Sequence, residues 1–191
     1  MWHGETPTET SDSVEGFGTA VFNGDKLVGE LTGMETICHL MVMNEFESCT
    51  ISVPDIFDKT HNNIDLRLYK KRNPKIKVDL VNGTPYISVE VFLQGYGLSL
   101  DSNTDYSSEE DLKKIDASAE FYLESEIRNY LYKTAKEFNS DIDGFGRKVV
   151  SKYLTIDEWI ESNWLDNYKN SFFKVKATVN IKSGYEFNKS P

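Results

Sequence analysis

Apolar and polar residues alternate along several segments of the chain, a pattern that predicts strands with one buried face. The first two segments flank Asn23-Gly24, and two later ones flank Asn82-Gly83; both dipeptides are typical of tight hairpin turns. Asn73-Pro74 marks a further predicted turn, so residues 64–100 are expected to form a three-strand antiparallel meander. The last strand is also expected to be antiparallel. The predicted strands cover residues 14–22, 25–31, 48–53, 64–69, 75–80, 86–100 and 173–182.

Apolar residues recur at intervals of three and four in the remaining segments, which predicts amphipathic helices. Thr32 with Glu35 has the spacing of a capping box for a helix to about Asn44, and Ser107 with Glu110 has it for a helix of about thirty residues. Residues 144–153 are expected to be helical, and a helix capped at Thr155 is expected to include Trp164. The predicted fold is α+β, an antiparallel sheet of hairpins and a meander packed against a long central helix and shorter helices.

The length fits a single folded domain, predicted for residues 14–191. Residues 1–13 are polar and are expected to be a disordered arm, the end of a linker or an expression remnant. The net charge of −10 argues against a protein that binds nucleic acid through overall charge. No apolar run reaches the length of a membrane helix, and the N-terminus lacks the apolar stretch of a signal peptide. A non-exported protein and a fragment without its targeting segment both remain open.

Catalytic and metal-binding motifs are lacking in the sequence, so no enzyme activity, cofactor or metal is predicted. His3, His39 and His61 stand at no ligand spacing from one another or from a cysteine pair. Cys38 is expected to be a core residue beside an ordinary His39, and its pairing with Cys49 stays open. The acidic stretch 105–126 is interpreted as a solvated helix face. The less favoured interpretation is calcium binding through the alternate acids of 101–105.

A run of bases without an intervening acid stands out in this acidic chain. On two paired strands these residues would form one basic hairpin end. They are interpreted either as a charged edge that prevents strand-on-strand association or as a docking patch for anionic lipid or an acidic partner. The run consists of Arg67, Lys70, Lys71, Arg72, Lys75 and Lys77.

A family resemblance rests on the order and spacing of several motifs between Gly16 and Gly184. The segments are Gly18-Thr19-Ala20-Val21-Phe22, then Asp25-Lys26-Leu27-Val28-Gly29 with Leu31, then Asp141-Ile142-Asp143-Gly144-Phe145-Gly146, Trp164 and the closing alternating strand. In this order they resemble the C-terminal domain of the Ger(x)C family, the C subunits of bacterial spore germinant receptors. Within the motif, Asp143, Gly144, Phe145 and Gly146 are expected to form a structural turn that buries Phe145.

The resemblance implies a non-enzymatic subunit that acts in receptor assembly or signalling during spore germination. Family members are lipoproteins on the outer face of the spore inner membrane, and they act with membrane-bound A and B subunits. This chain has no lipid-anchor cysteine motif, so the resemblance implies a soluble domain excised from a longer protein. The alternative is a domain that binds a nutrient such as an amino acid or sugar, with Tyr96, Tyr106 and Tyr185 as stacking candidates.

Overall fold

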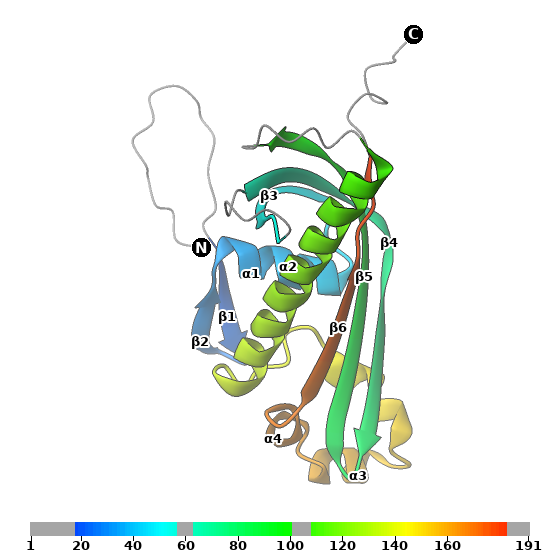
Figure 1. Cartoon of the computed structure of the whole chain (residues 1–191). Coiled ribbons are helices and arrows are strands. Elements are labelled where there is room, and N and C mark those ends of the chain that lie inside the picture. Colours follow the sequence, from blue (N-terminus) through cyan, green and yellow to red (C-terminus); the bar gives the residue numbers. More distant parts are fainter. Residues whose placement is uncertain (1–17, 57–62, 101–107, 183–191) are drawn as a thin grey trace, which may run out of the picture.

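A computed structural model describes residues 18–56, 63–100 and 108–182. It confirms the α+β fold: a small hairpin, a larger mixed sheet and a long helix that crosses one face of that sheet (Figure 1). The predicted N-terminal arm and the calcium-binding candidate at 101–105 lie outside the described residues, as do His3, His61, Tyr106 and Tyr185.

The small hairpin consists of β1 (Thr19–Asn23) and β2 (Lys26–Leu31). Its two turn residues are Gly24 and Asp25, because Asn23 still pairs with Lys26. Gly24 adopts a left-handed φ of 65°. The turn therefore lies one residue later than the sequence pattern indicated. Helix α1 (Gly33–Met43) follows, and its predicted capping box is confirmed by reciprocal bonds between Thr32 and Glu35.

The larger sheet has the strand order β3-β4-β5-β6, with β7 also paired to β5. The strands are β3 (Ser48–Pro54), β4 (Asn63–Val81), β5 (Thr84–Leu100), β6 (Phe172–Thr178) and β7 (Ile181–Lys182). Strands β4 and β5 form one long hairpin, and its turn at Asn82 and Gly83 is confirmed, since both residues have positive φ.

Two predictions for this sheet are wrong. Asn73-Pro74 is not a turn, because it lies within the single 19-residue strand β4. Proline has no N–H to donate to the neighbouring strand, and register shifts between Lys70 and Lys75 accommodate it. Strand β6 pairs with β5 in parallel, not antiparallel. The long helix between the two strands carries the chain back along the sheet, the connection that parallel neighbours require.

Helix α2 (Glu109–Lys136) is the predicted long helix, but its cap is Ser108 with Asp111 and not Ser107 with Glu110. Its apolar stripe is buried against the alternating apolar residues of β6. Two short 3-10 turns, η1 (Phe145–Lys148) and η2 (Val150–Lys152), follow, and then α3 (Ile156–Glu161) and α4 (Trp164–Tyr168). The predicted single helix through Trp164 is interrupted at Asn163, whose φ of 44° is left-handed.

Carboxylates of α2 close the outer edge of the sheet. Asp116, Glu120 and Glu124 accept bonds of 2.7, 2.9 and 3.1 Å from the backbone N–H groups of Ile181, Val179 and Ala177, in that order. Their four-residue helical spacing thus matches every second residue of the extended segment from the end of β6 to the start of β7. The interpretation of this acidic stretch as a solvated face is wrong for these three residues, because they replace the missing neighbour strand.

Within the described residues, none of the helices is both long and apolar enough to cross a membrane.

Candidate functional site: an open basic sheet face

The two faces of the large sheet differ in character. Residues of one face, such as Ile87 and Val89, are buried, and helices α1 and α2 cover that side (Figure 1). Their neighbours along the strands point to the other face, where Tyr86 and Phe172 are 42% and 53% exposed and stack at 5.1 Å. We call this second side the open face.

Cations outnumber carboxylates on the open face. The strand register aligns them in rows: Lys75, Glu90 and Lys176 form one, and Lys77, Ser88 and Lys174 the next. The cations placed on this face by the register are Arg67, Arg72, Lys75, Lys77, Lys174, Lys176 and Lys182, and the carboxylates are Asp65, Asp79 and Glu90. A protein of net charge −10 therefore presents one locally cationic surface.

The predicted basic run contributes to the open face, but it does not form a hairpin end. Because β4 is continuous, the run extends along the middle of one strand, and its members point in different directions. Arg67, Arg72, Lys75 and Lys77 belong to the open face. Lys70 turns to the helix side, where its Nζ donates to the carbonyl of Asn44 at 3.3 Å. Lys71 is exposed at the register shift.

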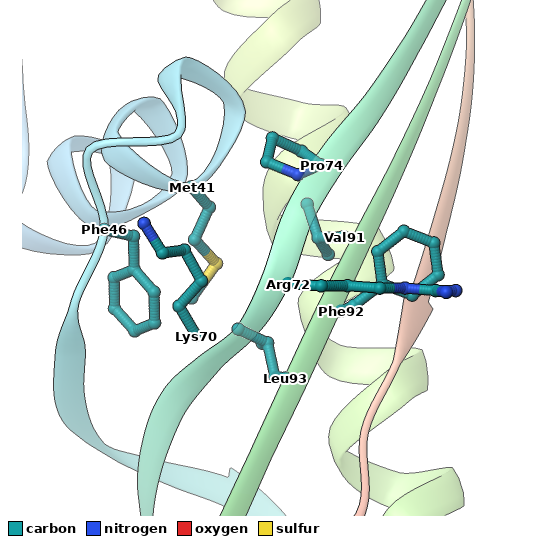
Figure 2. A pocket seen from close by; sticks show the side chains of 8 residues that line it. All are labelled: Met41, Phe46, Lys70, Arg72, Pro74, Val91, Phe92 and Leu93. Atoms are coloured by element: carbon teal, nitrogen blue, oxygen red, sulfur yellow. The ribbon is translucent and has the colours of Figure 1, made fainter.

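Figure 2 shows this divergence at the irregular part of β4. Lys70 lies beside Met41 and Phe46, whereas the guanidinium of Arg72 covers the ring of Phe92, 3.6 Å from its centroid. This contact leaves Phe92 only 6% exposed, although it belongs to the open face. The cavity between these side chains measures about 10 Å³, room for about one water molecule and not for a ligand.

Polar contacts fix other parts of the open face. Arg67 donates to the hydroxyls of Thr50 and Ser48 at 3.0 and 3.1 Å, and the hydroxyls of Tyr69 and Tyr96 lie 3.3 Å apart. Tyr96, a predicted stacking candidate, is therefore part of this network. Three lysines of the open face were not predicted as site residues: Lys174, Lys176 and Lys182. In the sequence, their alternation with apolar residues indicated only the polar face of a strand. The pairing of β6 and β7 with β5 brings them to the same surface as the cations of β4.

The motif residues of the family resemblance meet on the helix side of the sheet around Asp141, the first residue of the Asp141–Gly146 segment. Its carboxylate accepts bonds from the backbone N–H of Phe145 (2.9 Å) and of Gly146 (2.7 Å), and from the indole N–H of Trp164 (2.8 Å). Gly144 has a φ of 68°, and the Phe145 ring is fully buried beside those of Tyr168 and Phe173. A Cβ on Gly146 would lie 2.7 Å from the Trp164 ring nitrogen.

Asp143 and Tyr130, which are both buried, form a second cluster with the partly exposed His39, and the sequence did not indicate it. Tyr130 donates its hydroxyl to the Asp143 carboxylate at 2.9 Å, and His39 Nδ1 lies 2.9 Å from the same carboxylate. Burial raises the pKa of Asp143 and outweighs these hydrogen bonds, which lower it. The cluster ties α1 and α2 to the motif. Because its carboxylate is sealed from solvent, we interpret it as structural.

Beside this motif lies an open groove of about 900 Å³ on the helix side of β4. One wall comes from Asn73, Pro74 and Ile76 of β4, and another from the η1–η2 segment. Its remaining walls include residues of the β1–β2 hairpin, the end of α1, Trp159 and Trp164. The size fits a ligand or a peptide segment.

Cys38 and Cys49 are both buried free thiols. Burial raises the pKa of Cys49 to about 11, so it is protonated at neutral pH and a poor nucleophile. Among the described residues, no group of three or more His, Cys, Asp or Glu side chains is arranged to hold a metal ion.

Comparison with known families shows to which protein family the chain belongs. The family model described as "Spore germination B3/ GerAC like, C-terminal" matches residues 17–184. The chain belongs to this GerAC-like family. The resemblance inferred from the motifs is confirmed, and the family is of the germinant receptor C subunit type, which is not a known enzyme family.

A solved structure supports the GerAC-like fold. The crystal structure of the GerBC protein is similar to this chain with a TM-score of 0.68 and 22% sequence identity, over 82% of this chain and 48% of that chain. At this level of identity the likeness shows a shared fold. The GerAC-like chain thus spans about half the length of the GerBC structure that it matches. No curated protein matches it.

Proposed function

We propose that this domain is a non-enzymatic docking module of a germinant receptor C subunit, and that it acts in receptor assembly during spore germination through its open face. The observation that carries the proposal is the cationic, aromatic surface on an otherwise acidic protein. The partner that fits this surface is an acidic protein surface. The membrane-bound A and B subunits of the receptor are the proposed partners.

The location of the proposed complex is the outer face of the spore inner membrane, where a lipid anchor of the full-length protein would hold it. Support for assembly comes from the charge distribution. An acidic domain is repelled by acidic surroundings unless one face is oriented towards them, and cations grouped on one face provide that orientation. Each exposed ion pair contributes up to about 1 kcal/mol, so the open face selects and orients a partner more than it anchors one.

Two double charge reversals in the full-length protein test this role. Lys75→Glu with Lys176→Glu reverses two cations of the open face in one row of the sheet. Arg128→Glu with Lys169→Glu makes the same change of charge at an exposed position of α2 and at the exposed residue that follows α4. We expect both proteins to accumulate in spores, and we expect only the open-face pair to reduce co-purification with the other receptor subunits and to slow germination.

Normal co-purification and germination of the open-face variant would refute the proposal. Undiminished co-purification together with weaker binding to vesicles that contain anionic lipid would instead assign the open face to the membrane. Because the two double variants have the same net charge, a difference between them cannot come from a general increase in acidity.

Nutrient binding is the second candidate, and the groove is the observation that favours it, because its volume falls in the range of small-molecule sites. The two motif carboxylates that line the groove are already engaged: Asp141 accepts three hydrogen bonds, and Asp143 accepts one from Tyr130 and lies beside His39 Nδ1. Calorimetric titration with germinant amino acids and sugars tests this function. We expect no heat of binding at micromolar concentrations, and a micromolar complex would favour nutrient sensing over docking.

A further inference from the structure

The two outer edges of the large sheet differ in how far their outward backbone groups are hydrogen-bonded. At the β6–β7 edge, three carboxylates of α2 bond the outward backbone N–H groups. At the other edge, β3 pairs with β4 only along residues 63–69. For the rest of β4, the hydrogen bonds from described residues to outward backbone groups are the Lys70 N–H to the Glu47 carbonyl, at 3.0 Å, and the Lys152 ammonium to the Val78 carbonyl; Lys152 also lies 3.6 Å from the Asp79 carboxylate. One edge is closed, and the other is left accessible between these two contacts.

The backbone direction at this accessible edge follows from the Val78 contact. Because Lys152 reaches the Val78 carbonyl from outside the sheet, the backbone groups of Val78 point outward. In an antiparallel pair the outward residues alternate, so the N–H and carbonyl of Ile76 also point outward, while those of Lys75 and Lys77 face β5. Ile76 lines the groove, which therefore runs beside outward backbone groups for which the described residues supply no partner.

Side chains at this edge also alternate. Ile76 points into the groove, where Val150 and Trp159 supply further apolar surface. Lys75 and Lys77 point to the open face. A strand added outside β4 would place every second side chain beside these lysines and the others beside Ile76.

We propose that the 71–77 stretch of β4 binds an extended segment of a partner protein as an added strand, and that this segment alternates acidic and apolar residues. The proposal deepens the assembly role and rests on it for its biological setting. Main-chain bonds to Ile76 would supply affinity, and the alternating side chains would supply selectivity. A second copy of this edge is excluded as the partner, because it would bring Lys75 and Lys77 against their own counterparts.

A synthetic peptide tests the proposal on the 191-residue chain: acetyl-Val-Glu-Val-Glu-Val-Glu-Val-amide, titrated by NMR. We expect saturable binding with a dissociation constant below about 1 mM, and at least about tenfold slower exchange of the Ile76 amide hydrogen, because strand addition bonds that amide. A peptide N-methylated at two adjacent central residues keeps the charges but loses donors on both strand edges, and we expect it not to bind.

Two single charge reversals locate the site. Lys75 and Lys176 occupy the same row of the open face, at the accessible edge and at the closed edge. Lys75→Glu is expected to weaken peptide binding about tenfold, and Lys176→Glu by less than about twofold, because only the former lies beside the added strand.

Three results would each overturn the proposal: no saturable binding, equal binding of the N-methylated peptide, or equal losses in the two variants. The last two would indicate attraction by charge alone. None of them bears on whether the open face contacts other receptor subunits in spores, so failure of strand addition is distinguishable from failure of the docking role.

Discussion

Removal of the Asp141 carboxylate is expected to destabilise the domain strongly, because three donors from two separate segments depend on it. The backbone N–H groups of Phe145 and Gly146 and the indole N–H of Trp164 all bond this side chain, at 2.7 to 2.9 Å. It therefore holds the glycine-containing turn against α4. Asp141→Ala would leave all three donors without their acceptor.

The magnitude follows from the number of bonds and their exposure. A hydrogen bond to a charged group contributes about 1.5 to 3 kcal/mol, so three bonds at the lower figure would total about 4.5 kcal/mol. Asp141 is half-buried, and water would replace part of what is lost. We expect Asp141→Ala to lower the free energy of unfolding by about 3 kcal/mol. Asp141→Asn retains one carbonyl oxygen and should cost about half as much.

Urea unfolding followed by circular dichroism measures this effect, with tryptophan fluorescence as a second probe near Trp164. Asp157→Ala is the matched control, since Asp157 is an exposed aspartate in the first turn of α3. Asp157→Ala should lower the free energy of unfolding by less than about 1 kcal/mol. If Asp141→Ala and Asp157→Ala unfold at the same urea concentration, the assignment of Asp141 as the anchor of the motif is wrong.

Three further perturbations test other contacts. Gly146→Ala would force the Trp164 ring to move and should cost about 1 to 3 kcal/mol in urea unfolding; a wild-type midpoint would contradict this close packing. Glu120→Ala leaves a backbone N–H at the closed sheet edge without its acceptor and should cost about 1 to 3 kcal/mol, whereas Glu120→Gln should be milder. Burial opposes ionisation of Glu35, but bonds from Lys133 and the helix cap lower its pKa below the ordinary 4.5. The stability from this pair is thus present above pH 4.5 and lost as pH falls through the lowered value, so the difference in unfolding free energy between wild type and Lys133→Met should shrink in acid; a constant difference would refute the pairing.

Local features of the fold were predictable because short-range interactions decide them. The reciprocal bonds of Thr32 and Glu35 follow from a three-residue spacing, and the apolar period of α2 follows from burial of one stripe. The failures arose where tertiary structure overrides a local signal. Pro74 would normally end a strand, but the register shifts in β4 accommodate it at a sheet edge.

The candidate site was predictable only in part, because it depends on strand pairing. The basic run in β4 was visible in the sequence, but Lys174 and Lys176 join it through the parallel pairing of β6 with β5, which alternation along one strand does not reveal. The cluster of His39, Tyr130 and Asp143 brings together residues from three distant segments. No spacing rule connects them.

Photo-crosslinking from the open face is the most direct test of the docking role. Ser88 lies between Lys77 and Lys174 in the strand register, so a benzoylphenylalanine there samples the centre of this surface. The same probe at the exposed Arg128 of α2 samples the helix side. In spores that carry the full-length protein, the account predicts crosslinks to other receptor subunits from position 88 and few or none from position 128. Crosslinks to those subunits from position 128 alone would contradict it.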